Sequence, residues 1–166
     1  SLSIPTYNRS KLIRKTIENL VNEINSYNLN EICRIDIFDN CSQDDTLLVC
    51  NSLLLESNVN YKIYDSPNNL GAELNFDRCV RYPNADYCWI FGSDDLIIDG
   101  ALKKICEFLL LFKPKGGITV NYIIDYGNNK VSNFKLFTPD LGNNKFEISN
   151  LNLLKIDKNK RNKLIS

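Results

Sequence analysis

The sequence predicts an α/β fold with a mostly parallel central sheet, and three observations support this prediction. Short apolar segments that end in polar residues alternate with longer segments along the chain up to Phe112. The longer segments repeat their apolar side chains every three to four residues, which is the period of a helix. The composition, with 43% hydrophobic and 24% charged residues, is that of a globular protein. Strands that alternate with helices need crossover connections, and these join parallel strands.

The first predicted strand is Leu2–Thr6, a short apolar segment at the start of the chain. Lys11–Ser26 follows as a helix, and Ser10 is its predicted N-cap because a serine there can accept a hydrogen bond from the first turn. Four apolar residues recur on one face of this helix at helical spacing, namely Ile13, Ile17, Leu20 and Ile24.

The later elements continue the alternation. The predicted strands are Ile32–Asp39, Tyr61–Tyr64 and Tyr87–Phe91, and the predicted helices are Thr46–Glu56, Ala72–Arg81 and Ala101–Phe112. Two further strands, Ile118–Asp125 and Lys130–Phe137, are expected to form a hairpin on the parallel sheet. Residues 138–166 are polar with weak periodicity. They are predicted to be a lid, a partial helix at Leu151–Ile156, a frayed end or the start of an incomplete region, beyond a domain of residues 1–137.

The composition excludes several kinds of site and protein. The 166 residues contain no His, which excludes Ser/His/Asp triads, Cys/His dyads and His-ligated metals within them. The 20 basic and 20 acidic residues balance, which argues against nucleic acid as a partner. The longest apolar run, Phe108–Phe112, is far shorter than the roughly 18 residues of a membrane span. No segment reads as a signal peptide.

The six cysteines form no C-x-x-C pair, and no His is present to complete a mixed zinc site. We therefore expect free thiols and a reducing, cytoplasmic setting. The chain has no Met and opens within a predicted strand, so we expect residues upstream of Ser1 to be missing.

Polar residues collect where the predicted strands end. The four clusters are Pro5–Arg9, Asp39–Ser42, Asn68–Gly71 and Ser93–Asp95. In an open parallel sheet, ligands bind outside the carboxyl ends of the strands. The four clusters are therefore expected to converge on one rim of the sheet.

Adjacent carboxylates at Asp94 and Asp95 are the sharpest chemical signal, because they repel each other after an apolar strand. A divalent cation relieves that repulsion, and Mg²⁺ or Mn²⁺ is typically held by one or two carboxylates with phosphate oxygens. The alternative is an acidic helix N-terminus. Asp39 could accept hydrogen bonds from a nucleobase or ribose, or it could form a turn or cap. Asp44 and Asp45 are predicted helix caps.

Taken in order, four motifs resemble glycosyltransferase family 2, namely Ser3–Arg9, Asp39–Thr46, Asn69–Gly71 and Trp89–Asp95. The resemblance implies the GT-A fold, a Rossmann-type nucleotide-binding sandwich, over residues 1–137. It also implies transfer of a sugar from a nucleoside-diphosphate sugar to an acceptor hydroxyl, with inversion. The implied setting is bacterial cell-surface polysaccharide or lipopolysaccharide synthesis at the inner face of the cytoplasmic membrane. The acceptor would be a saccharide or lipid-linked saccharide, and missing segments could supply peripheral membrane association.

The resemblance also implies roles for single residues. Pro5, Thr6 and Asn8 would line the nucleotide pocket. Asp39 would recognise the base, uracil in many members, so a UDP-sugar is the expected donor. Asn69 and Gly71 would lie near the nucleotide and the donor sugar. Ser93 and Asp94 would contact ribose or sugar, and Asp95 with Asp94 would hold Mn²⁺ or Mg²⁺. Gly92 stands where many members have the first Asp of the motif.

The resemblance does not identify the general base. Asp125, Asp140 and Glu147 have suitable chemistry, but none lies in a matching motif. Three other functions remain open. The chain could be a non-catalytic nucleotide-binding module or truncated relative. It could be a sugar nucleotidyltransferase, although Thr6–Asn8 lacks a Gly-rich basic phosphate loop. It could also be a phosphotransferase with Asp39 as nucleophile, without an accompanying phosphate-site pattern.

Overall fold

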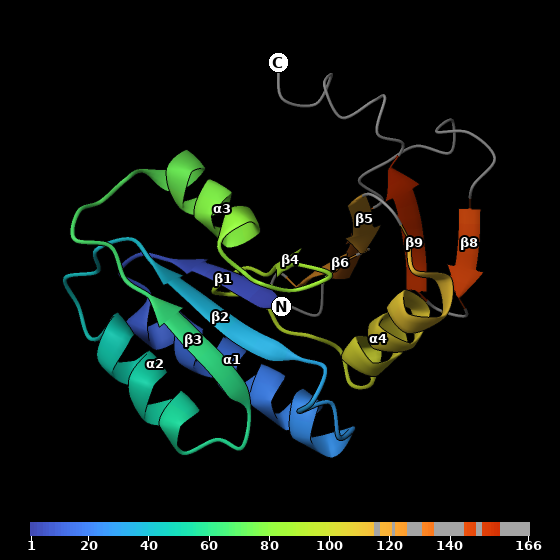
Figure 1. Cartoon of the computed structure of the whole chain (residues 1–166), viewed down its shortest axis with the longest axis horizontal. Helices are drawn as coiled ribbons and strands as arrows, with labels where there is room; N and C mark the ends of the chain where they lie inside the picture. The colour runs from blue at the N-terminus through green and yellow to red at the C-terminus, as the bar shows by residue number, and fades with distance from the viewer. Residues whose placement is uncertain (115–116, 121, 126–130, 135–144, 149–150, 157–166) are drawn as a thin grey trace. The chain divides into compact units, whose positions relative to one another are not determined.

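The computed structural model describes residues 1–114, 117–120, 122–125, 131–134, 145–148 and 151–156 (Figure 1). The chain forms two compact units, Ser1–Cys106 and Glu107–Ser166. The elements of the first unit are β1 (Leu2–Thr6), α1 (Ser10–Ser26), β2 (Arg34–Asp39), α2 (Thr46–Leu55), β3 (Asn60–Tyr64), α3 (Ala72–Arg81), β4 (Trp89–Ile90) and the start of α4 (Ala101–Phe112). The domain boundary expected at residue 137 stays a prediction.

The first unit contains a four-stranded sheet in the order β3-β2-β1-β4, and all of its neighbouring strands are parallel. This confirms the predicted α/β architecture. Figure 1 shows α1 and α2 on one face of the sheet and α3 on the other. Because the strands run in one direction, their carboxyl ends share one edge. There Thr6 of β1 stands opposite Asp39 of β2.

The core of the first unit lies between the sheet and α1. The four apolar residues that predicted the inner face of α1 are fully buried, namely Ile13, Ile17, Leu20 and Ile24. They pack with Ile4, Ile35 and Ile37 from the central strands. Burying each such side chain contributes about 1.5–3 kcal/mol, so this layer is the main stabilising feature of the unit.

The start of α1 differs from the prediction. The helix begins at Ser10, Arg9 occupies the N-cap position, and no side chain of this cap forms a capping hydrogen bond. Ser10 is therefore not the N-cap. Its main-chain N–H instead donates to Oδ2 of Asp44 at 3.2 Å, which is an acceptor in the next loop. A tertiary contact thus replaces the local cap.

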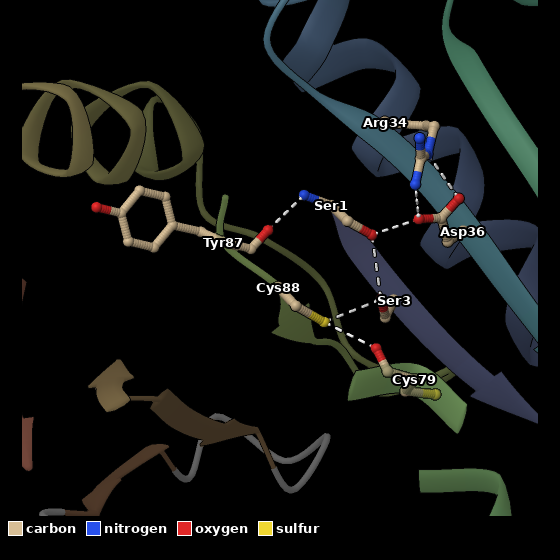
Figure 2. Close-up of polar contacts among 7 residues, drawn as sticks. All are labelled: Ser1, Ser3, Arg34, Asp36, Cys79, Tyr87 and Cys88. Carbon is tan, nitrogen blue, oxygen red and sulfur yellow. Dashed lines mark hydrogen bonds and ion pairs between the residues drawn. The ribbon is translucent and has the colours of Figure 1, made fainter. Parts of the chain in front are cut away.

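Strand β4 has only two residues, fewer than the predicted Tyr87–Phe91, and a polar network secures it (Figure 2). The network surrounds Asp36, which is fully buried and pairs with Arg34 through two 2.8 Å contacts. Ser1 Oγ donates to Asp36 at 2.5 Å. The hydroxyl of Ser3 lies 3.1 Å from the Cys88 thiol beside β4. A buried charge needs such partners, and here they tie β4 to the central strands.

The described residues of the second unit form the rest of α4 and the strands β5 (Gly117–Val120), β6 (Tyr122–Asp125), β7 (Val131–Phe134), β8 (Lys145–Ile148) and β9 (Leu151–Ile156). The antiparallel pair β6–β7 bears out part of the predicted hairpin, but it forms a two-stranded sheet separate from the parallel one. The single strand expected at Ile118–Asp125 is wrong, because β5 pairs with β9 whereas β6 pairs with β7. The partial helix expected at Leu151–Ile156 is wrong. That segment is a strand because β5 and β8 pair with it from both sides, which overrides local propensity.

The six cysteines are thiols and form no disulfide, as expected, and the sulfur atoms of Cys33 and Cys106 lie 3.5 Å apart. Within the residues that the structure describes, no helix is long and apolar enough to cross a bilayer.

Candidate functional site

Every residue predicted for the site lies in the first unit, where the strands of the parallel sheet end. These residues are Pro5, Thr6, Asn8, Asp39, Asn69, Gly71, Ser93, Asp94 and Asp95. Pro5 and Thr6 close β1, and Asp39 closes β2. The other residues lie in the loops that follow β1, β3 and β4. The sheet therefore brings the four predicted clusters to one edge.

The loops after β1 and β2 are joined by hydrogen bonds. Asn8 adopts a left-handed backbone conformation with φ of 51°, which asparagine tolerates better than most residues. Its N–H donates to Ser42 Oγ at 2.9 Å, and its side-chain oxygen accepts from the Gln43 N–H at 2.7 Å. The Arg9 N–H donates to Thr46 Oγ1 at 2.8 Å. These contacts fix the two loops as one surface.

Asp44 completes that junction and confirms its predicted role in capping. Its carboxylate accepts hydrogen bonds from the main-chain N–H groups of Ser10 and Thr46, at 3.2 and 3.0 Å, and from the Thr46 hydroxyl. Desolvation acts to raise the pKa of Asp44, but these hydrogen bonds outweigh it and lower the pKa to about 2. The predicted capping by Asp45 is wrong, because Asp45 occupies the N-cap position of α2 but its side chain forms no capping hydrogen bond.

Asp39 is fully buried at the end of β2, and both of its carboxylate oxygens already accept hydrogen bonds. Oδ2 accepts from the Ser42 N–H at 2.8 Å, and Oδ1 accepts from the Ser42 hydroxyl at 2.5 Å. The turn predicted as the alternative role of Asp39 therefore forms. Each carboxylate oxygen has a second lone pair, so Asp39 can also accept from a ligand while Ser42 holds it in place.

Asn40 holds the loop after β3 in place, a role that we did not predict from the sequence. Its side-chain NH₂ donates to Asn69 Oδ1 at 2.9 Å and to the Gly71 carbonyl at 3.2 Å, and its Oδ1 accepts from the Leu70 N–H at 2.8 Å. Gly71 has φ of 82° and ψ of 166°, a conformation that is essentially restricted to glycine. The glycine thus permits the turn that Asn40 fixes.

Arg78 of α3 holds the ends of β2 and β3 together, and it was also missed in the sequence. Its guanidinium is buried and donates to the carbonyls of Asp39, Tyr64 and Asp65 at 2.9–3.1 Å. It also donates to Asn75 Oδ1 at 2.9 Å, and Asn75 in turn donates to the Phe38 carbonyl. Arg78 therefore fixes the main chain beneath the carboxylate of Asp39.

Asp94 and Asp95 converge on the space beside Gly92. A Cβ added to Gly92 would lie 2.4 Å from Asp95 Oδ2 and 3.3 Å from Asp94 Oδ1. Both carboxylates are exposed. Arg9 Nη1 lies 3.7 Å from Asp94 Oδ2, an ion pair that contributes at most about 1 kcal/mol at such exposure. Because glycine has no Cβ, position 92 leaves space for the two carboxylates to converge.

This pair of carboxylates fits a divalent cation as part of its coordination shell. Mg²⁺ and Mn²⁺ prefer oxygen ligands and typically take one or two carboxylates together with phosphate oxygens of a substrate. Among the described residues, no group of three or more His, Cys, Asp or Glu side chains could hold a metal. A cation bound here would therefore share its ligands with a substrate.

The hydroxyl of Thr6 adds an unpaired polar atom to the same edge. Its Oγ1 is buried and has no hydrogen-bond partner within the described part of the chain. A buried hydroxyl without a partner is costly, so it marks a place where a ligand can make a hydrogen bond. The main-chain carbonyl of Thr6 is already engaged, since it accepts from the Asn40 N–H at 3.0 Å.

Residues 1–162 match the family model for glycosyl transferase family 2. The chain belongs to this family. Over 112 residues it is 38% identical to the abequosyltransferase RfbV of Salmonella typhimurium strain LT2, and the match covers 66% of this chain and 32% of the relative. The chain thus spans about a third of the length of that relative.

Several solved structures are similar to this chain in fold. S. aureus TarS has a TM-score of 0.59 at 20% identity over 74% of this chain and 20% of TarS. TarS 1–349 in complex with UDP has a TM-score of 0.59 at 21% identity, covering 70% and 36%. The mannosyltransferase PcManGT from Pyrobaculum calidifontis, in complex with GDP-Man and Mn²⁺, scores 0.60 at 17% identity, covering 70% and 33%. At these identities the likeness shows the fold, and it confirms the expected GT-A architecture.

None of the three carboxylates considered as the general base belongs to the first unit. Of the three carboxylates with suitable chemistry, Asp125 ends β6 and Glu147 lies in β8, both in the second unit. Asp140 lies outside the described residues.

Proposed function

We propose that this chain is the donor-binding part of an inverting glycosyltransferase that uses a nucleoside-diphosphate sugar. The donor that we propose is a UDP-sugar. Membership of glycosyltransferase family 2 supports the class of reaction. The observation that carries the proposal is the meeting of Thr6, Asp39 and the Asp94–Asp95 pair at one edge of a parallel sheet. Buried acceptors for a base and exposed carboxylates for a cation lie at the place where this fold binds ligands.

Each part of the edge has a chemical task in this proposal. Asp39 accepts a hydrogen bond from the nucleobase, and Ser42 keeps the carboxylate in position through its two contacts. The free hydroxyl of Thr6 bonds the nucleoside. Asp94 and Asp95 would hold Mn²⁺ or Mg²⁺, which when bound would neutralise the charge of the departing diphosphate. Because Ser42 holds the carboxylate of Asp39 before the substrate arrives, little reorganisation of this acceptor is needed during the reaction.

The group that this chain helps to transfer is a glycosyl residue. The acceptor hydroxyl attacks the anomeric carbon from the face opposite the diphosphate, and a general base takes the hydroxyl proton. The diphosphate leaves with the electron pair of the broken bond.

The name of the Salmonella relative, an abequosyltransferase, supports transfer of a glycosyl group, and we place this transfer in surface polysaccharide or lipopolysaccharide synthesis. A saccharide or lipid-linked saccharide acceptor, met at the cytoplasmic face of the membrane, belongs to the same proposal.

Thermal unfolding with a panel of nucleoside diphosphates tests the donor site. UDP, GDP, CDP and dTDP are each added with Mn²⁺ or with EDTA to the wild type, to Asp95→Ala and to Asp86→Ala. Asp86 is an exposed carboxylate that precedes β4 and so lies at the opposite end of the strands. A ligand at 100 times its dissociation constant stabilises the folded state by about 2.7 kcal/mol, a shift of several degrees.

We expect one diphosphate to raise the melting temperature of the wild type and of Asp86→Ala in a Mn²⁺-dependent way. Asp95→Ala should lose the Mn²⁺-dependent part of that rise. If a folded wild-type chain responds to no nucleotide, the donor-binding proposal is wrong. If nucleotide binds but a chain carrying its acceptor region transfers no sugar, the non-catalytic binding module is the correct alternative.

A further inference from the structure

Helix α1 carries three polar side chains on its inner side, at positions where a core helix would normally present apolar groups. They are Thr16, Asn19 and Glu23, spaced three and four residues apart, so they lie along one line of the helix. Thr16 is fully buried and Glu23 is 5% exposed. Asn19 is half-buried. Polar groups removed from water need hydrogen-bond partners, and all three side chains have theirs in one distant segment.

That segment is the main chain between β4 and α4. Thr16 Oγ1 lies 3.1 Å from the Ser93 carbonyl and 3.0 Å from the Asp95 carbonyl, and its single hydroxyl hydrogen is shared between these two acceptors. Asn19 donates to the Ile97 carbonyl at 3.2 Å and accepts from the Ile97 N–H at 2.7 Å. Thr16 and Asn19 thus contact the main chain at every second residue from Ser93 to Ile97.

Glu23, the last of this row of three side chains (Thr16, Asn19 and Glu23), contacts the start of α4. Its two carboxylate oxygens accept from the N–H groups of Gly100 and Leu102, each at 3.2 Å. The first N–H groups of a helix have no partner within the helix, and a carboxylate there is also favoured by the helix dipole. Glu23 therefore fixes the far end of the segment that Thr16 holds at its beginning.

The position of Thr16 relative to the two carboxylates is specific. The Ser93 carbonyl belongs to the peptide unit that leads into Asp94, and the Asp95 carbonyl belongs to the unit that follows Asp95. The hydroxyl of Thr16 thus holds the main chain immediately before and immediately after the pair. Since the side chains of Asp94 and Asp95 are exposed, the anchored main chain determines where they start.

We propose that Thr16, Asn19 and Glu23 are positioning residues that hold the Ser93–Leu102 segment against α1 and so set the two carboxylates for a divalent cation. This inference rests on the proposed function, because it assumes that Asp94 and Asp95 meet a cation together with a diphosphate. The row itself touches neither cation nor substrate. It acts through the main chain, with Thr16 as the member closest to the carboxylates.

Three variants separate anchoring from a general loss of stability. Thr16→Val keeps the shape of the side chain but removes the hydroxyl donor. Thr16→Ser keeps the hydroxyl. Ile17→Val is the control, because Ile17 is the next residue of α1, is equally buried and packs in the apolar core. All three variants and the wild type are compared with and without ligand.

The first readout needs no ligand and is amide hydrogen exchange over residues 93–97. We expect exchange there to accelerate by about tenfold in Thr16→Val, as for the loss of one buried hydrogen bond. Exchange in β2 should stay unchanged, and Thr16→Ser and Ile17→Val should resemble the wild type. Equal exchange in Thr16→Val and the wild type would refute the anchoring.

The second readout is the Mn²⁺ linkage, defined as the ratio of the dissociation constants of UDP in EDTA and in Mn²⁺. We expect this ratio to fall about tenfold in Thr16→Val, with UDP affinity in EDTA unchanged and with rescue by Thr16→Ser. An undiminished ratio in Thr16→Val would overturn the positioning role. A wild type with no Mn²⁺ linkage would instead refute the cation of the proposed function, while hydrogen exchange still decides the anchoring.

Discussion

Replacing Arg78 by lysine tests whether a buried guanidinium holds the edge of the sheet. The side chain is 7% exposed and donates four hydrogen bonds, to three main-chain carbonyls and to Asn75. Lysine keeps the charge and most of the length of arginine. It presents its three donors from a single nitrogen, however, so it cannot reach carbonyls at the ends of two strands and the side chain of α3 together.

The expected magnitude follows from the number of contacts. A hydrogen bond from a charged group contributes about 1.5–3 kcal/mol, and a buried acceptor left without a partner costs about 1–3 kcal/mol. Arg78→Lys loses at least one such bond and strains the others, so we expect the free energy of unfolding to fall by about 2–4 kcal/mol. That is a large part of the roughly 5–15 kcal/mol that stabilises an ordinary domain.

Urea unfolding followed through the fluorescence of Trp89, the only tryptophan, measures this loss in the first unit. Arg81→Lys is the matched control, since Arg81 is on the same helix, is exposed and pairs with Asp77 at 2.6 Å. We expect the control to change the free energy of unfolding by less than about 0.5 kcal/mol. If Arg78→Lys unfolds at the same urea concentration as Arg81→Lys, the guanidinium does not hold the strand ends as described.

Three further substitutions give distinct outcomes. Gly71→Ala should cost about 1–3 kcal/mol in urea unfolding through backbone strain alone, because an added Cβ meets nothing within 4 Å; an unchanged midpoint would contradict the strain. Gly92→Ala should change stability by less than about 0.5 kcal/mol, as at most surface sites, because the exposed carboxylate of Asp95 can move aside. Because the carboxylate of Asp95 is then displaced, the Mn²⁺ linkage of UDP binding should fall in Gly92→Ala. An unchanged linkage would show that the carboxylate is not displaced. The pKa of Asp44 is lowered to about 2, below the roughly 3.9 of an unfolded chain, so its contribution to stability is present above pH ~4 and disappears as the pH falls through ~2. Urea midpoints measured from pH 5 to pH 2 should therefore fall less steeply in Asp44→Asn than in the wild type, and parallel slopes would argue against this carboxylate.

Local patterns were sufficient to predict most of the first unit. The bounds of α3 and α4 agree with the predicted Ala72–Arg81 and Ala101–Phe112. Both helices could be predicted because each segment itself contains the helical periodicity and the flanking turn residues. The location of the candidate site followed from the same information. Polar clusters after successive strands must share an edge once the strands are parallel.

Contacts between distant residues were not predictable in the same way. Thr16 and Arg78 look like ordinary polar residues of surface helices, and their partners lie 77 and 39 residues away for the Ser93 and Asp39 carbonyls. The segment Leu151–Ile156 failed for a related reason. Whether this segment is helical or extended depends on whether neighbouring strands pair with it. A short apolar run does not contain information about that pairing.

Main-chain groups at the end of a parallel strand have no partner in the sheet. This explains why α1 and α3, the helices that support the site, depart from the usual amphipathic pattern. Where β2 and β3 stop, the carbonyls of Phe38, Asp39 and Tyr64 need donors, and the side of α3 that faces them carries Asn75 and Arg78. Three large apolar residues of the same helix are exposed instead, namely Leu74, Phe76 and Val80, although Cys79 is buried. The main-chain groups of the segment beyond β4 likewise need hydrogen-bond partners. The side chains of Thr16, Asn19 and Glu23 on α1 supply them. A helix whose polar residues face the sheet therefore marks the edge where the ladder ends, which is also the edge where a ligand can bind. In this chain, the departures from the amphipathic pattern in α1 and α3 were the available signal for the residues that support the site.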